Sequence, residues 1–507
     1  MVCRRWRQAA DGGAEVWGAA ALRRPRGGTA APAQPRIPLD GAFGVLRRQR
    51  AHLRRLHLDE GALQGGGTDA GMLAAALQAA CGPGSGLTDL TIQGDPHPAV
   101  TQALPGGAAQ LTALTLRALP GRGTAALGWD QLAHLTHLSS LAILSVKRLD
   151  ASPKALGRLT ALTRLRLSSK RHSQAEVAPL LLACSPTLQR LELVCGTIDK
   201  APLEGSPAVV PTAEAQQQPA HLHLAEPPAA SYGGSLQGPS LAAALAERWG
   251  RLEAMRLQEV HVAHAAVLQV LPTLRCLTSL HLAPLGCDAA CVEVAQRCTG
   301  LQELVLGRYS EARLPELPTG ALGHLTRLRV SGTAALVALP DSWCALPNLQ
   351  SFEVESCERL RRLPAALAGI TQLERLLFSH QRMERLPSQL TGLSQLTRLA
   401  VAACSLHHLP PGPYLHNLRE LVLFANSLSC VPPALGDAAL GAACLTRLDL
   451  SSNYSHHLSA ADIEVLRHLS LVETLDLRRQ EYGPEDRHPP ELLAQLRAVL
   501  PRCDVLA

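Results

Sequence analysis

One six-residue pattern, Leu-x-x-Leu-x-Leu, returns along almost the whole chain. Regular copies start at residues 53, 111, 162, 188, 277, 301, 325, 418 and 445, as in "LTRLRL" and "LQELVL". Degenerate copies start at 87, 138, 252, 349, 373, 396 and 472, which makes sixteen in all. From 252 to 418 successive copies are 25, 24, 24, 24, 24, 23 and 22 residues apart. A period held this closely is the signature of a repeat architecture.

The spacing of the leucines predicts a short strand in every copy. The leucines at the first, fourth and sixth positions are expected to point inward, while the residues between them alternate outward in a short strand. One such unit cannot bury its leucine face alone, but stacked units form a parallel sheet over a continuous aliphatic core. We therefore expect an α/β solenoid.

The chain resembles leucine-rich-repeat proteins from about residue 51 to its C-terminus. Repeats of that family run 20–29 residues, with Asn or Cys after the strand. Cys357, Cys404, Asn426 and Asn453 hold that position here, whereas Thr333 and Gln381 depart from it. The resemblance implies a curved parallel sheet on the concave face, with helices and 3₁₀ or extended segments on the convex face. The Asn and Cys side chains are expected to satisfy backbone groups of the turns.

Two kinds of connection between strands are expected. From residue 325 onward a Leu-Pro or Val-Pro step follows each strand, and proline there favours extended or short 3₁₀ segments. Earlier repeats carry helix-like segments, "AEVAPLLLACSPT" (175–187) and "DAACVEVAQRCTG" (288–300). The second of these resembles the cysteine-containing repeats that are common in F-box proteins.

Composition shifts divide the chain further. We expect a partial F-box-like helical segment (1–22), a linker (23–50), a first block of repeats (51–196), a low-complexity insertion loop rich in Pro, Ala, Gln, Gly and Ser (197–240), a second block of repeats (241–490) and a C-terminal cap with helical leucine spacing (491–507).

Composition also excludes several classes of protein. Aromatic residues are 3% of the chain, so the core is expected to be aliphatic, and no apolar run approaches the ~20 residues of a membrane span. Fourteen cysteines without a signal peptide or a CxxC pair favour reduced, buried thiols over disulfides or zinc, and a cytoplasmic location, with nucleus or cytoskeleton also open. "QGGGTDAG" (64–71) lacks the Lys-Ser/Thr of a phosphate loop. The pairs His407-His408 and His456-His457 have no paired carboxylate at catalytic spacing. We expect no enzyme activity, no cofactor and no metal.

The first residues, "VCRRWRQAADGGAEVW", resemble the C-terminal half of an F-box. Val2, Cys3, Trp6 and Trp17 match its V-C-[KR]-x-W helix and its second tryptophan. This resemblance implies contact with the Skp-type adaptor of cullin–RING ubiquitin ligases. The usual Leu-Pro beginning is absent, so either Met1 is an internal methionine or the F-box has decayed. An unrelated helix packed on the first repeat is a further alternative.

The residues two, four and six places after the first leucine of each copy are expected to face the concave surface. Candidate partner-binding residues there are Arg327, Arg329, Glu353, Glu355, Arg375, Arg398, Glu420, Arg447 and Asp449. Acids interleave with the arginines and aromatic residues are few, which argues against nucleic acid and favours a protein partner.

These features together favour a protein-interaction scaffold that does no chemistry itself. The first hypothesis is an F-box/leucine-rich-repeat substrate receptor of a cullin–RING ubiquitin ligase. The alternative is a stand-alone intracellular repeat scaffold in signalling or in cytoskeletal or axonemal assembly.

Overall fold

The computed structural model describes most of the repeat region and both of its ends. The described residues are 19–22 (backbone only), 46–48, 50–59, 69–81, 84–93, 110–117, 132–148, 153–171, 183–195, 246, 248–258, 269–283, 288–318, 320–360, 364–380, 385–386, 390, 392–437, 442–453, 458–478 and 488–507. The expected insertion loop at 197–240 lies outside them.

Each of the sixteen copies of the pattern forms a strand that begins two residues after its first leucine. These strands are β2 (Arg55–Asp59), β3 (Asp89–Gln93), β4 (Ala113–Arg117), β5 (Ser140–Arg148), β6 (Arg164–Arg171), β7 (Arg190–Cys195), β8 (Ala254–Gln258), β9 (Ser279–Ala283), β10 (Glu303–Gly307), β11 (Arg327–Ser331), β12 (Ser351–Glu355), β13 (Arg375–Ser379), β14 (Arg398–Ala402), β15 (Glu420–Val422), β16 (Arg447–Asp449) and β17 (Thr474–Asp476). Two more, β1 (Ala19–Leu22) and β18 (Asp504–Leu506), complete an 18-stranded sheet.

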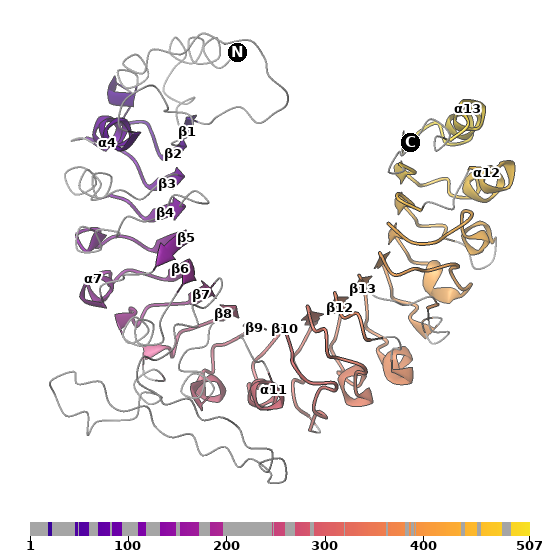
Figure 1. Ribbon diagram of the computed structural model, residues 1–507, viewed down its shortest axis with the longest axis horizontal. Helices are drawn as coiled ribbons and strands as arrows, with labels where there is room; N and C mark the ends of the chain where they lie inside the picture. The colour runs from indigo at the N-terminus through magenta and orange to yellow at the C-terminus, as the bar shows by residue number, and fades with distance from the viewer. Residues whose placement is uncertain are drawn as a thin grey trace, which may run out of the picture.

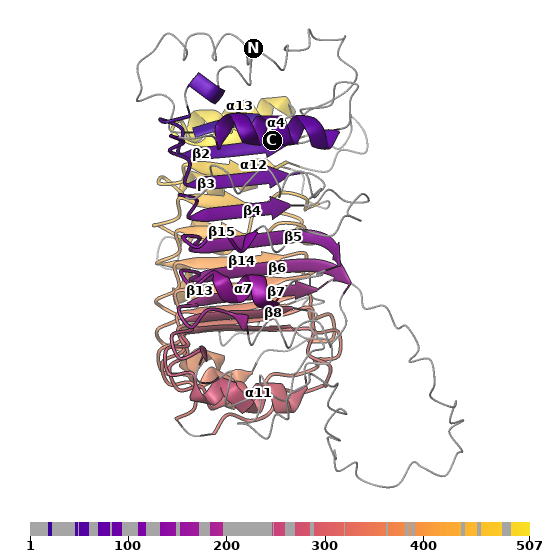
Figure 2. The ribbon, with the colours of Figure 1, turned by 90° about the vertical axis from the view of Figure 1, so that its left-hand side faces the viewer.

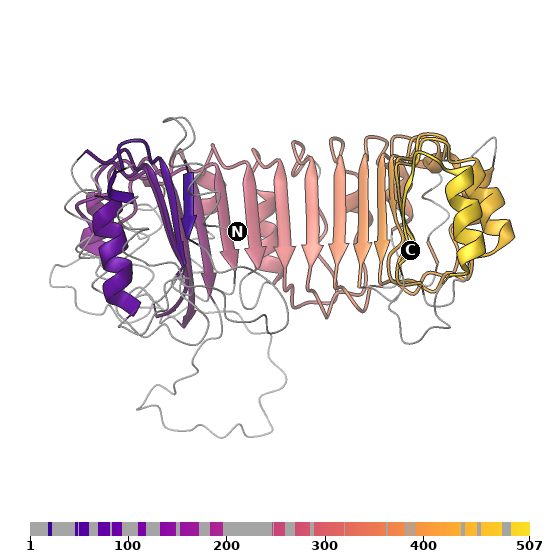
Figure 3. The same ribbon diagram turned by 90° about the horizontal axis from the view of Figure 1, so that it is seen from above.

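The strands pair in parallel in the order of the sequence and bend into a horseshoe (Figure 1). Seen from above, they all point the same way, and from the side they stack one above another (Figures 2 and 3). Leucine lies on leucine in this register; Leu304, for example, is level with Leu280 on one side and Leu328 on the other. The α/β leucine-rich-repeat solenoid predicted from the sequence is confirmed.

The core is the continuous layer that the inward leucines form between the two faces. The first leucine of a copy is also buried, as in Leu325 and Leu349. Aromatic residues replace leucine at Phe352 and Phe378, whose rings meet edge to face with centroids 6.5 Å apart. Such a pair adds about 1 kcal/mol to the burial of its area.

Helices and 3₁₀ segments cover the convex face (Figure 1). They are α4 (Asp69–Ala80), α7 (Pro153–Arg158), η2 (Leu271–Thr273), α11 (Ala289–Gln296), η3 (Asp341–Cys344), η4 (Ala365–Gly369), η6 (Pro413–Leu415), η7 (Pro433–Gly436), α12 (Ala460–Arg467) and α13 (Pro490–Val499). The 3₁₀ turns predicted after Leu-Pro and Val-Pro steps are present as η3, η4, η6 and η7. The helix expected within 288–300 is α11, which Asp288 caps by accepting a hydrogen bond from the Cys291 N–H.

A buried ladder of side chains holds the turns after the strands. The Asn426 amide donates to the carbonyls of Val401 (2.6 Å) and Leu423 (2.9 Å) and accepts from the N–H groups of Cys404 (3.0 Å) and Leu406 (3.1 Å). Asn453, Cys357 and Cys404 are buried at the same position of their repeats, as predicted.

Thr333, which departs from the family pattern, still takes part in this ladder. Its side chain is fully buried, and its hydroxyl lies 2.8 Å from the Cys357 thiol. Because a threonine hydroxyl can both donate and accept, Thr333 joins the ladder through the Cys357 side chain. Gln381 lies outside the described residues.

The residue directly before the ladder position adopts the left-handed conformation in repeat after repeat. It is Ser356 (φ 52°), Ala403 (φ 51°), Ala425 (φ 54°) and Ser452 (φ 58°), and glycine only at Gly332 (φ 62°). The backbone N–H of each donates to a carbonyl of the next repeat, which holds a conformation that non-glycine residues avoid.

A second ladder, of hydroxyl groups, runs along the opposite edge of the sheet, where the chain enters the strands. Each hydroxyl donates to a carbonyl of the preceding repeat over 2.9–3.1 Å, and its members are Thr88, Thr112, Ser139, Thr163, Thr278, Thr326, Thr397 and Thr446. This ladder was not predicted from the sequence, although Thr or Ser recurs there directly after the first leucine.

Both ends of the sheet differ from expectation. Ala19–Leu22 belongs to the segment expected to be helical, but it forms β1 and pairs in parallel with β2. That expectation is wrong for these four residues, because pairing with an open strand edge outweighs the helix propensity of alanine. At the other end α13 is present as predicted, and the chain then adds β18 to the sheet beyond β17.

Burial divides the cysteines into two reactivity classes. It raises the pKa of the thiols of Cys81, Cys184, Cys298 and Cys344 to about 12, whereas Cys276 and Cys430 are exposed. Since the thiolate is the nucleophile, iodoacetamide is expected to label Cys276 and Cys430 before these four buried thiols. Peptide mass spectrometry over a time course checks this order, and early labelling of Cys184 would contradict the packing described above.

Candidate partner-binding face

The outward side chains of the strands form three columns on the concave face. The first, second and third columns hold the residues two, four and six places after the first leucine of each copy. In β11 these are Arg327, Arg329 and Ser331, and in β12 they are Ser351, Glu353 and Glu355. Each of the nine predicted concave-face residues belongs to one of these columns, so their placement follows the alternation of the strands.

The described arginines of the second column are neutralised by neighbouring acids. Arg329 pairs with Glu353 (3.7 Å) and with Glu355 on the adjacent strand. Further toward the N-terminus, Glu192 bridges Arg166 (3.1 Å) and Arg256 (3.6 Å). Partly exposed pairs of this kind add little stability, but they cancel the charge of the middle of the face.

The first column keeps free positive charge. Arg327 and Arg375 are exposed, and neither forms an ion pair within the described part of the chain. Farther along the column, Glu420 lies between Arg398 (3.2 Å) and Arg447 (3.8 Å), so that two guanidinium groups share one carboxylate. The edge of the face at the strand starts is therefore basic.

An apolar strip, which was not predicted from the sequence, lies beside this basic edge. It consists of Leu377, Ala400 and Val422 in the second column, with Ala402 and Phe424 in the third. Phe424 is 38% exposed, one of three large hydrophobic side chains in the described residues that are exposed to this degree. The signal was in the sequence: in three successive copies the second-column position holds an apolar residue instead of a charged one.

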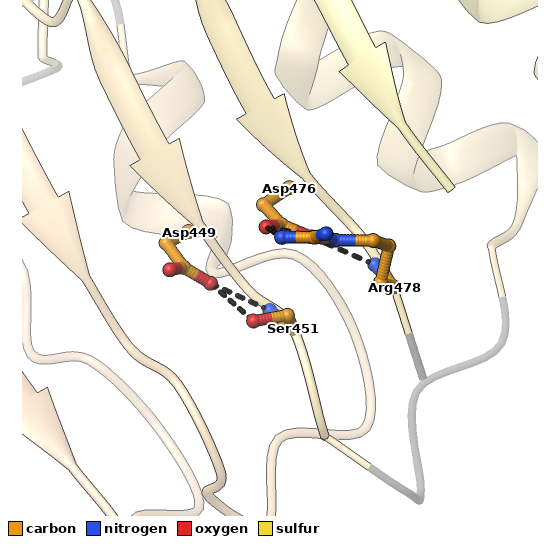
Figure 4. A network of polar contacts seen from close by, with 4 residues as sticks. All are labelled: Asp449, Ser451, Asp476 and Arg478. Atoms are coloured by element: carbon orange, nitrogen blue, oxygen red, sulfur yellow. Dashed lines mark hydrogen bonds and ion pairs between the residues drawn. The ribbon is translucent and has the colours of Figure 1, made fainter. Parts of the chain in front are cut away.

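Acidic residues follow the strip at its C-terminal side. Asp449 accepts hydrogen bonds from the N–H (3.0 Å) and the hydroxyl of Ser451, and Asp476 beside it pairs with Arg478 (Figure 4). Burial raises the pKa of the Asp476 carboxyl, but the hydrogen bonds and charge of Arg478 outweigh it and leave that pKa below its ordinary value.

His281 lies in the second column between the two blocks of ion pairs. Burial, and the charges of Arg256 and Arg329, lower its pKa from 6.5 to about 4. Because the unfolded chain takes up this proton first, His281 costs stability as the pH falls from about 6.5 toward 4.

The His281→Gln variant is therefore expected to lose less stability than the wild type between pH 6.5 and pH 4. Urea unfolding followed by circular dichroism across that range measures the difference. His416→Gln, at an exposed position, is the matched control and is expected to follow the wild type. Parallel curves for the wild type and His281→Gln would contradict the lowered pKa.

The described residues offer no cluster of three or more His, Cys, Asp or Glu side chains that could hold a metal ion. Cys291 and Cys298 are buried in the core, and His407 and His408 are exposed. No helix in the described part of the chain is long and apolar enough to cross a membrane. The expected adaptor residues Val2, Cys3, Trp6 and Trp17 lie outside the described residues.

The solenoid is similar to solved structures of leucine-rich-repeat proteins. A leucine-rich-repeat protein of Leptospira interrogans matches with a TM-score of 0.50 and 18% identity, over 91% of this chain and 97% of that one. The leucine-rich-repeat domain of the type III effector XopL matches with a TM-score of 0.34 and 25% identity, over 42% of this chain and 70% of that domain. An internalin of Listeria monocytogenes matches with a TM-score of 0.35 and 14% identity, over 94% and 98%.

No family model and no curated protein sequence matches the chain. The Leptospira structure nevertheless covers nearly the whole chain at the level of the fold. Together with the one parallel sheet and the repeat pattern, it establishes that this protein has the leucine-rich-repeat solenoid fold.

Proposed function

We propose that this protein is a non-enzymatic interaction scaffold that holds a protein partner on the concave face of β11–β16. The observation that carries the proposal is the apolar strip with exposed Phe424, which begins at Leu377 on the same strand as Arg375, an exposed arginine with no ion-pair partner among the described residues. Protein interfaces are enriched in aromatic residues and arginine, and both are exposed on this face. The convex face, in contrast, is covered by helices and 3₁₀ segments (Figure 1).

Protein is a better occupant for this face than nucleic acid. A nucleic-acid surface needs a nearly unbroken row of cations, with aromatic side chains on which bases stack. Here Glu353, Glu355 and Glu420 interrupt the arginines and pair with them. Alternating charge of this kind sets the register and specificity of a protein complex.

Affinity capture from cell extract tests this proposal with one substitution on each surface. Val422→Asp places a charge in the apolar strip, and Val337→Asp is the matched control, since Val337 is 48% exposed in the loop between β11 and η3. The wild type and Val337→Asp are expected to capture proteins that bind the concave face. Val422→Asp is expected to lose these proteins. Circular dichroism verifies that both variants fold. If Val422→Asp captures the same proteins as the wild type, the proposal is wrong.

The more specific form of the proposal is a substrate receptor of a cullin–RING ubiquitin ligase. It is supported by the F-box-like residues Val2, Cys3, Trp6 and Trp17 and by the cysteine-containing repeat around α11. Pull-down with a purified Skp-type adaptor tests it, and Trp6→Ala is expected to weaken capture while Trp343→Phe, in the repeat core, leaves it unchanged. If neither this chain nor a version extended upstream to the next in-frame start binds the adaptor, the receptor role fails and the stand-alone scaffold remains.

A further inference from the structure

The apolar strip is bordered by charges that are not equivalent. Toward the N-terminus its neighbours are Glu353 and Glu355, whose carboxylates are already engaged by Arg329. Toward the C-terminus, Asp449 is bonded to Ser451 and Asp476 to Arg478 (Figure 4). Along these two borders the charged groups therefore have partners within the chain.

The border along the strand starts is different. Arg375 lies there without an ion-pair partner in the described structure, and Arg327, two strands away, also has none among the described residues. An Arg side chain is fully charged at physiological pH and binds carboxylates with two parallel hydrogen bonds. Two strand spacings separate the two backbones by about 10 Å, and the first and second columns are about 7 Å apart along a strand.

We propose that the partner of this face is an acidic segment that carries an apolar anchor. This inference rests on the proposed function and names the chemistry of its occupant. An apolar side chain packs on Leu377, Val422 and Phe424, and carboxylates of the same segment pair with Arg375 and Arg327. The distance between these two arginines corresponds to about three residues of extended chain. A basic segment would instead meet two unpaired guanidinium groups.

The test uses three fluorescein-labelled peptides of equal length and measures the anisotropy of their binding to the full chain. One peptide is built from Glu and Leu, one from Lys and Leu and one from Glu and Ser. The Glu–Leu peptide is expected to bind, and more weakly as salt rises, because the exposed guanidinium charges are screened. The Glu–Ser peptide, which lacks the anchor, is expected to bind at least about tenfold more weakly.

Matched variants assign the binding to this face. Arg375→Glu is expected to weaken binding of the Glu–Leu peptide about tenfold or more. Arg297→Glu, at the exposed C-terminal end of α11 on the convex face, is expected to leave that binding unchanged. Phe424→Ser is expected to weaken binding of the Glu–Leu peptide as well. Leu471→Ser, at a residue 56% exposed between α12 and β17, is the matched control.

Preference for the Lys–Leu peptide, or a Glu–Leu affinity that Arg375→Glu leaves intact, overturns the inference. If no peptide binds while capture from extract still depends on Val422, the acidic partner is wrong and the concave scaffold stands. If capture is also indifferent to Val422, the proposed function fails with it.

Discussion

Asn426→Ala is expected to lower the free energy of unfolding by about 3 kcal/mol, because the substitution leaves several buried backbone groups without hydrogen-bond partners at once. The Asn426 amide is the partner of the carbonyls of Val401 and Leu423 and of the N–H groups of Cys404 and Leu406. Water cannot replace these bonds without opening the turn between two repeats. The midpoint of urea unfolding measures the loss, and hydrogen exchange at Cys404 and Leu406 localises it.

A second asparagine supplies the control for that experiment. Asn417 is exposed and makes one bond, from its amide to the Ser394 carbonyl (2.8 Å). Asn417→Ala is expected to cost less than about 1 kcal/mol. Equal shifts in the two variants would show that the buried ladder does not hold the turns.

Trp343→Ala is expected to destabilise the fold by about 4 kcal/mol, because it empties a large volume under the convex face. Trp343 is buried within η3, and its indole N–H donates to the Pro315 carbonyl of the preceding repeat (2.8 Å). Trp343→Phe keeps most of the volume and loses the hydrogen bond, so it is expected to cost less than half as much. Thermal unfolding of the two variants checks this order, and a larger loss for the Phe variant would contradict it.

The sequence predicts the repeat strands well because their information is local. The period-2 alternation around the leucines fixes which side of each strand is buried, and so it also placed Arg327, Arg329 and Asp449 on the concave face. The strands β1 and β18 carry no such leucine pattern. "AAAL" and "DVL" form strands because an open edge of the sheet is next to them in space, which no window of sequence contains.

The candidate partner-binding face is only partly predictable from the sequence, for a related reason. Column membership follows from the sequence, but the ion-pair partners depend on side-chain directions between neighbouring repeats. Arg327 and Arg329 are the same residue type on the same strand. Arg329 nevertheless pairs with two glutamates, whereas Arg327 has no ion-pair partner among the described residues. The apolar strip could have been found from Leu377, Val422 and Phe424, had the outward positions been compared across repeats and not only searched for charge.

A photo-crosslinking amino acid at single positions tests most directly whether a protein occupies the concave face. Benzoylphenylalanine replaces Phe424 in the apolar strip or Leu471 between α12 and β17, and the chain is irradiated in cells. A partner on the concave face is expected to give adducts of defined mass from position 424 and no matching adducts from position 471. The 424 adducts are expected to disappear when Arg375→Glu is added. Adducts from position 471 alone, or equal adducts from both positions, would contradict it and place the partner elsewhere on the solenoid.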